Sequence, residues 1–202
     1  MNKEILIICR GGGDLATGIV HRLFRAGYQV LILETAEPAA IRRQVSFCEA
    51  VYEGTATVEG VTAERIYTAK KQAVEEVLQR GRIPLLVDPD GRSIEVLKPD
   101  VVVDAIIAKK NLGTYKEMAP LVIGIGPGFV AGKDVHLVVE SMRGHNLARI
   151  LETGSALANT GIPGNIGGYT KERVIHAVAE GYMKNIHQIG DVVQKGDRKS
   201  VV

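Results

Sequence analysis

Small residues near the amino terminus have the spacing of a phosphate-binding turn. Gly11, Gly13 and Ala16 stand at G-x-G-x-x-A spacing directly after an apolar run, and small side chains there let the backbone approach a phosphate. A helix that begins near Asp14 would point its free N–H groups at the same anion. The turn therefore predicts a nucleotide-like ligand, although a glycine turn of this kind can also be purely structural. The expected ligand contacts are Gly11, Gly12, Gly13, Asp14, Leu15 and Ala16.

Two acidic residues bear on the identity of that ligand. Glu34 ends the second apolar run, where a carboxylate can accept hydrogen bonds from a ribose diol, which favours NAD over NADP. Arg42 and Arg43 follow closely and could neutralise a 2′-phosphate, so the choice of cofactor stays open. Asp14 would repel a pyrophosphate. Either Asp14 caps the helix and turns away, or the bound group is not an ordinary pyrophosphate.

A second group of candidates follows two later apolar runs. Asp104 interrupts one of them and needs a partner, for which Lys109 and Lys110 are candidates, because an unpaired buried carboxylate is costly. In open α/β sheets the ligand lies beyond the carboxyl ends of the strands. We therefore expect ligand contacts at Lys109 and Asn111, with a loop exposed to solvent as the alternative.

The run VIGIGPGF (122–129) again leads from an apolar strand into glycines. Gly126 and Gly128 flank Pro127, which lacks an N–H donor and fixes the turn. A second phosphate or pterin contact at these glycines is one interpretation. A sharp structural turn is the other.

The segment DVHLVVESMRGH (134–145) holds the strongest acid–base candidates. On a strand, His136 and Glu140 share one face, and His145 follows after the turn. These three residues could shuttle protons and are the predicted catalytic residues. No helical His spacing or cysteine supports a zinc site, so no metal is predicted. Structural or exposed groups are the alternative.

Composition limits the class of protein. The chain has 202 residues, a net charge of +2 and two cysteines, and no apolar run approaches the 18 residues of a membrane span. The weak charge predicts neither a nucleic-acid nor a membrane partner. Sparse cysteines are typical of a reducing cytoplasm, and Cys9, in an apolar strand, is expected to be a packed thiol.

The elements that must position these residues follow from hydrophobic periodicity. Residues 5–8 and 28–33 predict buried strands, and apolar residues at helical spacing predict a helix between them that ends at Gly27. Further strands are expected at 83–87, 101–108, 121–125, 135–139 and 147–151, a strand pair or edge strand at 55–66, and helices at 39–51 and 68–80. This order predicts an α/β fold: a Rossmann-like, mostly parallel sheet with flanking helices, over residues 1–172.

The tail differs in character. Residues 174–178 and then IGDVVQKGD (189–197) resemble the opening of a biotinyl/lipoyl-like β-sandwich, with two turns that bracket a short strand. We therefore predict a second, β-rich region at 173–202. The sequence ends at Val202, too early to close such a fold, so a truncated carboxyl terminus is expected.

Several long motifs together resemble the YqeB-type accessory proteins of selenium-dependent molybdenum hydroxylases. The resemblance covers about residues 5–197. Its motifs are GGGDLATGIVHRLFRAG, IRRQVSFCEAVYEG, VDAIIAKKNLGT, GIGPGFVAGKDVHLVVE, RGHNLARI and NTGIPGNIGGYTKERV.

The resemblance implies a cytoplasmic maturation factor that binds a molybdopterin-type cofactor and has a xanthine-dehydrogenase-like hydroxylase as its partner. An NAD(P)-dependent oxidoreductase, with His136 or His145 as proton donor, is one alternative. A scaffold that docks on the hydroxylase without any ligand is another. Neither the residues nor the resemblance decides whether the protein is catalytic or forms a homo-oligomer.

Overall fold

The chain forms two compact units. The computed structural model describes residues 5–162, 164–174, 176, 179–182, 184–197 and 200–201. One unit extends to Asn159 and the other begins at Thr160. The first unit contains the sheet, and the second contains the tail.

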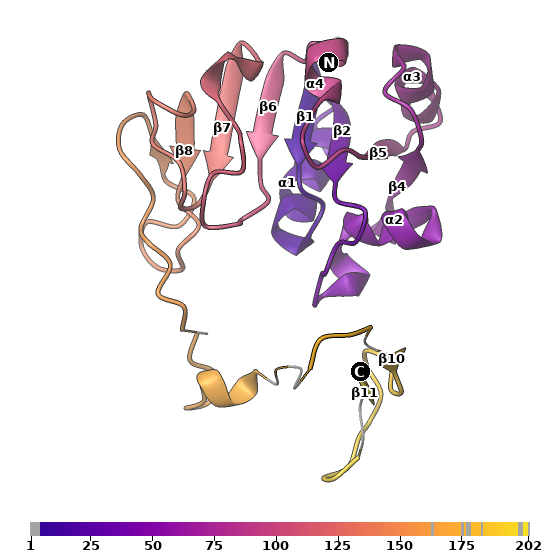
Figure 1. Cartoon of the computed structure of the whole chain (residues 1–202), viewed down its shortest axis with the longest axis vertical. Coiled ribbons are helices and arrows are strands. Elements are labelled where there is room, and N and C mark those ends of the chain that lie inside the picture. The colour runs from indigo at the N-terminus through magenta and orange to yellow at the C-terminus, as the bar shows by residue number, and fades with distance from the viewer. Residues whose placement is uncertain are drawn as a thin grey trace. The chain divides into compact units, whose positions relative to one another are not determined.

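The first unit is built on one large sheet, which contains nine strands among the residues described (Figure 1). Across the sheet the order is β3-β4-β5-β2-β1-β6-β7-β8-β9. The strands are β1 Leu6–Arg10, β2 Gln29–Glu34, β3 Thr55–Val58, β4 Val61–Ile66, β5 Ile83–Val87, β6 Val101–Asp104, β7 Leu121–Ile125, β8 Leu137–Val139 and β9 Ile150–Leu151. The strands from β4 to β8 are parallel, and only β3 and β9, at the two edges, pair antiparallel with their neighbours. The mostly parallel α/β sheet that the sequence predicts is thus confirmed.

Few helices accompany this sheet. They are α1 Asp14–Arg25, α2 Ala50–Glu53, α3 Lys71–Gln79 and α4 Ser93–Leu97, with short 3-10 helices η1 Arg43–Val45, η2 Phe47–Glu49, η3 Lys116–Met118 and, in the tail, η4 Lys171–Arg173. The longest, α1, buries Ala16 and Val20 on one stripe. It carries Arg22 and Arg25 in its last turn, where positive charges interact favourably with the helix dipole.

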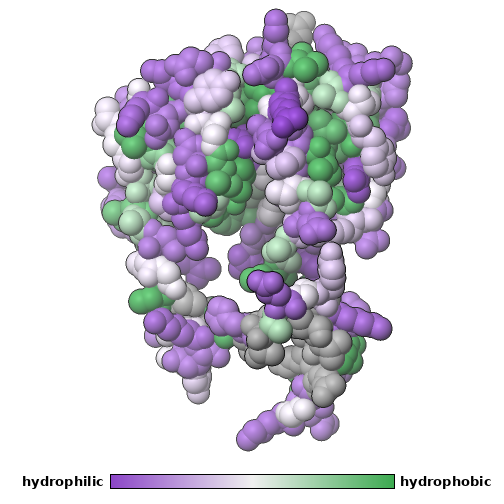
Figure 2. Space-filling view, in the orientation of Figure 1, coloured by the Kyte–Doolittle hydropathy of each residue, from purple (hydrophilic) through white to green (hydrophobic). Residues whose placement is uncertain are grey.

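Apolar side chains form two layers, one on each face of the sheet. Successive residues of a strand point to opposite faces, so Cys9 packs with α1 and α2, whereas Ile8 packs with α3 and α4. On the face of the molecule seen in Figure 2, hydrophilic residues are widespread and hydrophobic ones fill the gaps between them. No helix in the described part of the chain is long and apolar enough to cross a membrane.

Several segments differ from the sequence prediction: the strand expected at 101–108 ends at Asp104, and the strand expected at 147–151 begins at Ile150. The single helix expected at 39–51 is divided into η1, η2 and α2, because Ser46 is extended (φ −128°) and its hydroxyl donates to the Arg42 carbonyl at 2.8 Å. The Phe47 amide then donates to the Thr17 hydroxyl at 2.9 Å instead of continuing a helix. Helix α4, at Ser93–Leu97, was not predicted.

The second unit contains little regular structure among its described residues. Strand β10, Lys184–Asn185, pairs antiparallel with β11, Ser200–Val201. Turns close at both predicted places, since the Asp191 amide donates to the Gln188 carbonyl and the Asp197 amide to the Gln194 carbonyl, each at 3.2 Å, but residues 191–194 between them do not form the expected short strand. Of the strand predicted at 174–178, residues 175, 177 and 178 lie outside the described residues. The biotinyl/lipoyl-like resemblance therefore stays a prediction.

Candidate functional site

The order of the strands defines where a ligand site is expected. From β1 the chain passes to β2 on one side, and later to β6 on the other side of β1. Such a reversal opens a crevice outside the carboxyl ends of the two central strands, where ligands of open α/β sheets bind. The loops that follow β1 and β6 therefore form the expected crevice.

The turn after β1 has two tightly packed glycines and one open glycine, and a Cβ at Gly12 would lie 3.1 Å from the Cys48 amide nitrogen. Gly11 has φ +99°, and a Cβ there would lie 3.0 Å from the Ala105 carbonyl oxygen and from the Ile106 Cα. This glycine is therefore needed for packing against the loop after β6. Gly13 has ordinary extended geometry (φ −64°), and a Cβ there would meet nothing within 4 Å. The open space of the turn thus lies at Gly13.

Glu34 is held against this turn by backbone amides. Its carboxylate accepts the Gly12 amide at 2.8 Å through Oε1 and the Thr35 amide at 2.6 Å through Oε2. Each carboxylate oxygen has a second lone-pair site, so Glu34 can still accept from a hydroxyl group. A ligand cannot use the Gly12 amide unless it displaces Glu34.

Asp14 is the first residue of α1, after Gly13 as N-cap. Its Oδ1 accepts the Leu15 amide at 2.9 Å, and its Oδ2 pairs with the Arg42 guanidinium. The charge that would repel a phosphate therefore has a counter-ion. The Arg42 side chain is 64% exposed, so its guanidinium can also meet a ligand from solvent.

Some backbone N–H groups of the turn after β1 have no hydrogen-bond acceptor among the described residues. In the part of the chain that the structure describes, the amides of Gly13, Asp14 and Ala16 have no hydrogen-bond acceptor. Amides at a helix N-terminus suit an anion. The turn therefore combines open donors with the carboxylate of Glu34 and the cation of Arg42.

Both cysteines are buried beside this turn. The Cys9 thiol is 3.7 Å from the Gly11 carbonyl oxygen, and the Cys48 amide donates to the Gly12 carbonyl at 2.8 Å. Burial, reinforced by the negative charge of Glu34, raises the pKa of Cys48 to about 12. Burial and the nearby Asp104 and Glu34 raise the pKa of Cys9 as well. Both side chains are therefore uncharged thiols near neutral pH.

Asp104 is buried at the carboxyl end of β6, and its partner is not one of the expected lysines. The Arg10 guanidinium lies 3.6 Å from its Oδ2, and the Thr114 hydroxyl donates to the same oxygen at 2.5 Å. Arg10 itself is only 2% exposed. Sequence reasoning missed this arginine, although a charged residue directly after the apolar run 5–9 was a usable signal.

The predicted contacts in the loop after β6 have different environments. Lys109 lies in a left-handed conformation (φ 63°), as does Ile107 (φ 58°), which is unusual for residues other than glycine. The Asn111 side chain is engaged within its own loop, because it donates to the Thr114 carbonyl and accepts the Thr114 amide, both at 2.7 Å.

The glycine loop after β7 lies against its neighbours at the same edge of the sheet. Gly128 has φ +116°, and a Cβ there would lie 2.8 Å from the Lys110 Cα. A Cβ at Gly126 would lie 2.5 Å from the Ser141 hydroxyl. The structure therefore brings the loops after β1, β6, β7 and β8 together at the carboxyl edge.

The three predicted acid–base residues are not brought together. His136 precedes β8, and its Nδ1 accepts the Val122 amide at 2.9 Å. Glu140 follows β8, is buried, and accepts the amides of Met142 and Leu157 at 2.7 and 2.8 Å. His145 is exposed in the next turn. Strand β8 covers only the three residues between His136 and Glu140, and the two side chains accept amides from different segments of the chain.

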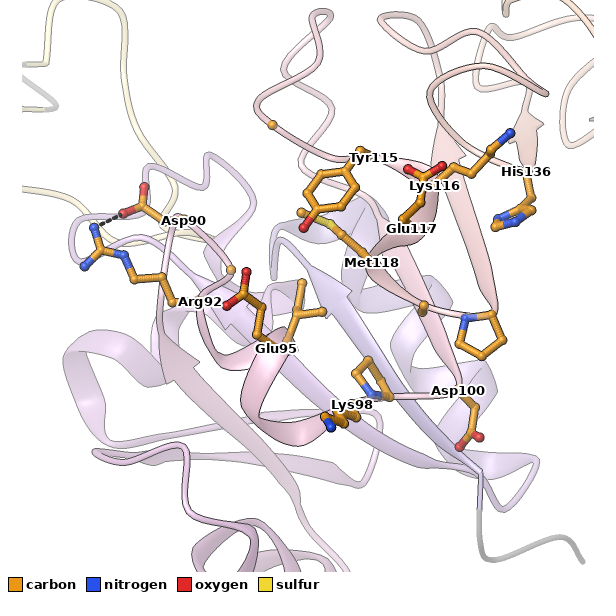
Figure 3. A pocket seen from close by; sticks show the side chains of 16 residues that line it. Asp90, Arg92, Glu95, Lys98, Asp100, Tyr115, Lys116, Glu117, Met118 and His136 are labelled. Carbon is orange, nitrogen blue, oxygen red and sulfur yellow. Dashed lines mark ion pairs between the residues drawn. The ribbon is translucent and has the colours of Figure 1, made fainter.

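His136 instead lines a groove of about 960 Å³ that does not include the glycine turn. Figure 3 shows Glu95 and Lys98, from the connection after β5, across from Tyr115 and Met118, from the connection after β6. The groove has both acidic and basic side chains at its rim. Among the described residues, no group of three or more His, Cys, Asp or Glu side chains is arranged to hold a metal ion.

Comparison with known proteins gives one informative similarity. The chain is 50% identical over 192 residues to a protein of Escherichia coli (strain K12) named "Uncharacterized protein YqeB". The match covers 95% of this chain but about a third (35%) of the relative's length. No family model and no solved structure matches the chain. The similarity supports the resemblance to YqeB-type proteins that the sequence motifs indicate.

Proposed function

We propose that the carboxyl edge of the sheet binds a nucleotide-containing cofactor of the molybdopterin type, and that the protein helps to mature a selenium-dependent molybdenum hydroxylase in the cytoplasm. The resemblance to YqeB-type accessory proteins motivates the choice of cofactor and of partner. The position of the glycine turn, where the strand order reverses, supports a cofactor site.

The observation that carries the proposal is the open space at Gly13. A methyl group there would meet no protein atom within 4 Å, and the amides around it have no acceptor among the described residues. A phosphate of the cofactor would accept from these amides and pair with Arg42. Hydroxyl groups of the cofactor would donate to Glu34.

Equilibrium titration of the purified protein with molybdopterin-type cofactor tests this function. We expect the Gly13→Ala variant to bind at least tenfold more weakly, because its methyl group occupies the phosphate position, while its free energy of unfolding changes little. Gly18→Ala is the matched control, since Gly18 lies on the exposed side of the same helix and its Cβ would also meet open space. Gly18→Ala should bind as the wild type does.

The alternatives give different results in the same assay. Binding of NADH or NADPH with micromolar affinity, without binding of molybdopterin, would favour the oxidoreductase. If no ligand binds and a molybdenum hydroxylase is still retained on the immobilised protein, the ligand-free scaffold would be supported. Absence of both ligand binding and hydroxylase retention would refute the proposed function.

A further inference from the structure

A buried ion pair stands at the point where the strand order reverses. Arg10 and Asp104 are register partners at the ends of β1 and β6, and their side chains are each only 2% exposed. A buried ion pair is tolerated where further hydrogen bonds satisfy both groups. The arrangement of those bonds indicates what this pair does.

The hydrogen bonds of the pair reach both ends of one loop, and one more joins Arg10 to the Pro89 carbonyl, after β5, at 2.9 Å. At the start of the loop, Asp104 accepts the Ile106 amide at 3.1 Å. At its end, Arg10 donates to the Leu112 carbonyl at 3.2 Å and to the Thr114 hydroxyl, which in turn donates to Asp104. Neither Arg10 nor Asp104 has a buried polar side-chain atom without a partner. The two charged groups thus fix the loop 105–114 at its two ends.

The loop 105–114 must be held in place by its surroundings, because part of its backbone has a disfavoured conformation. Ile107 and Lys109 have positive φ, a conformation that side chains other than glycine disfavour and that persists only where the surroundings impose it. The backbone of the same loop lies directly against Gly11 on one side and Gly128 on the other. Its conformation therefore determines the shape of the crevice.

We propose that Arg10, acting through Asp104 and Thr114, is a positioning residue that holds the loop 105–114 in the conformation that borders the cofactor site. Arg10 is buried and does not touch the ligand. The consequence for ligand affinity rests on the proposed function, whereas the effect on the loop does not.

Substitution of Thr114 tests the network with little change in volume. Thr114→Val removes the hydroxyl group that joins Arg10 to Asp104, and Thr114→Ser keeps it. By hydrogen exchange, we expect the Ile106 and Thr114 amides to exchange at least tenfold faster in Thr114→Val, with β2 and β5 unchanged. Molybdopterin-type cofactor should bind Thr114→Val at least fivefold more weakly, and Thr114→Ser should restore both properties. Thr57→Val, at an exposed hydroxyl of β3, is the control.

The outcomes separate this proposal from the proposed function. Unchanged exchange in the loop, or exchange that rises equally throughout the sheet, would overturn the positioning role. If Thr114→Val does not fold, Arg10→Lys provides a second test at the Ile106 and Thr114 amides, because lysine keeps the charge but cannot reach the hydroxyl group and the Leu112 and Pro89 carbonyls together. If the wild type binds no cofactor, the proposed function fails, and the exchange measurement still decides the role of Arg10.

Discussion

Replacing Gly11 with alanine tests the packing of the glycine turn against the loop after β6. The backbone at Gly11 has φ +99°, and its amide donates to the Leu33 carbonyl at 2.8 Å. A Cβ would lie 3.0 Å from two backbone atoms, the Ala105 oxygen and the Ile106 Cα. Neither neighbour is the end of a flexible side chain, so the backbone of the turn or of the loop after β6 must move.

The expected loss of stability has two parts. A residue other than glycine in a disfavoured backbone region costs about 1–3 kcal/mol. Overpacking of a filled interior costs about 1–3 kcal/mol more. We therefore expect Gly11→Ala to lower the free energy of unfolding by about 2–6 kcal/mol, a large fraction of the total for a domain of ordinary stability. Gly13→Ala, two residues later, has neither penalty, and we expect a change below about 1 kcal/mol.

Urea denaturation followed by circular dichroism measures both variants against the wild type. The two substitutions add the same methyl group to the same turn, so any difference reflects local geometry. A Gly11→Ala variant within about 0.5 kcal/mol of the wild type, or a Gly13→Ala variant as unstable as Gly11→Ala, would refute this account of the turn.

Three further predictions concern stability. Glu140→Gln should cost about 1–3 kcal/mol at pH 7, because the buried carboxylate accepts two backbone amides. Although burial opposes it, bonding to the Leu157 and Met142 amides lowers the pKa of Glu140. The advantage of the wild type over Glu140→Gln should therefore shrink as the pH falls below about 4.5 in acid titrations of unfolding. The raised pKa of Cys48 means that the unfolded thiol ionises first. This stabilisation should thus be complete below about pH 9, and Cys48 should contribute a loss of up to about 1.4 kcal/mol per pH unit above it. Cys48→Ala should remove this share of the slope in urea titrations, whereas the share of the buried Cys9 should remain. Gly18→Ala should raise the free energy of unfolding by about 0.5–1 kcal/mol, since it replaces an exposed glycine inside α1, and a lower thermal midpoint would contradict this.

The pattern of apolar residues was enough to predict the strands that consist of one continuous apolar run. The runs at β1, β2, β5 and β7 are apolar and end at glycine, acid or turn residues, so their existence and order could be read directly. Helix α4 was not predicted because it has only five residues, which are too few to show a helical repeat of apolar side chains. Its position depends on packing of Ile94 against the sheet.

The candidate site was harder to predict, because its contacts join distant parts of the chain. The glycines could be found from their spacing, since each turn is encoded in a few consecutive residues. The partner of Asp104, by contrast, is Arg10, 94 residues away, and nearby lysines were the natural but incorrect choice. His136 and Glu140 were expected on one strand face, but their hydrogen-bond partners, the amides of Val122, Met142 and Leu157, could not be read from the spacing of the two residues.

The burial of both native sulfhydryl groups has a practical consequence for spectroscopy. Cys9 and Cys48 are shielded from solvent and uncharged at neutral pH, so maleimide reagents should leave them unmodified in the folded protein. A single cysteine introduced on the surface would then be the sole attachment point for a fluorophore or spin label. Distances within the folded protein, or to any protein that binds it, could be measured without removing either native cysteine.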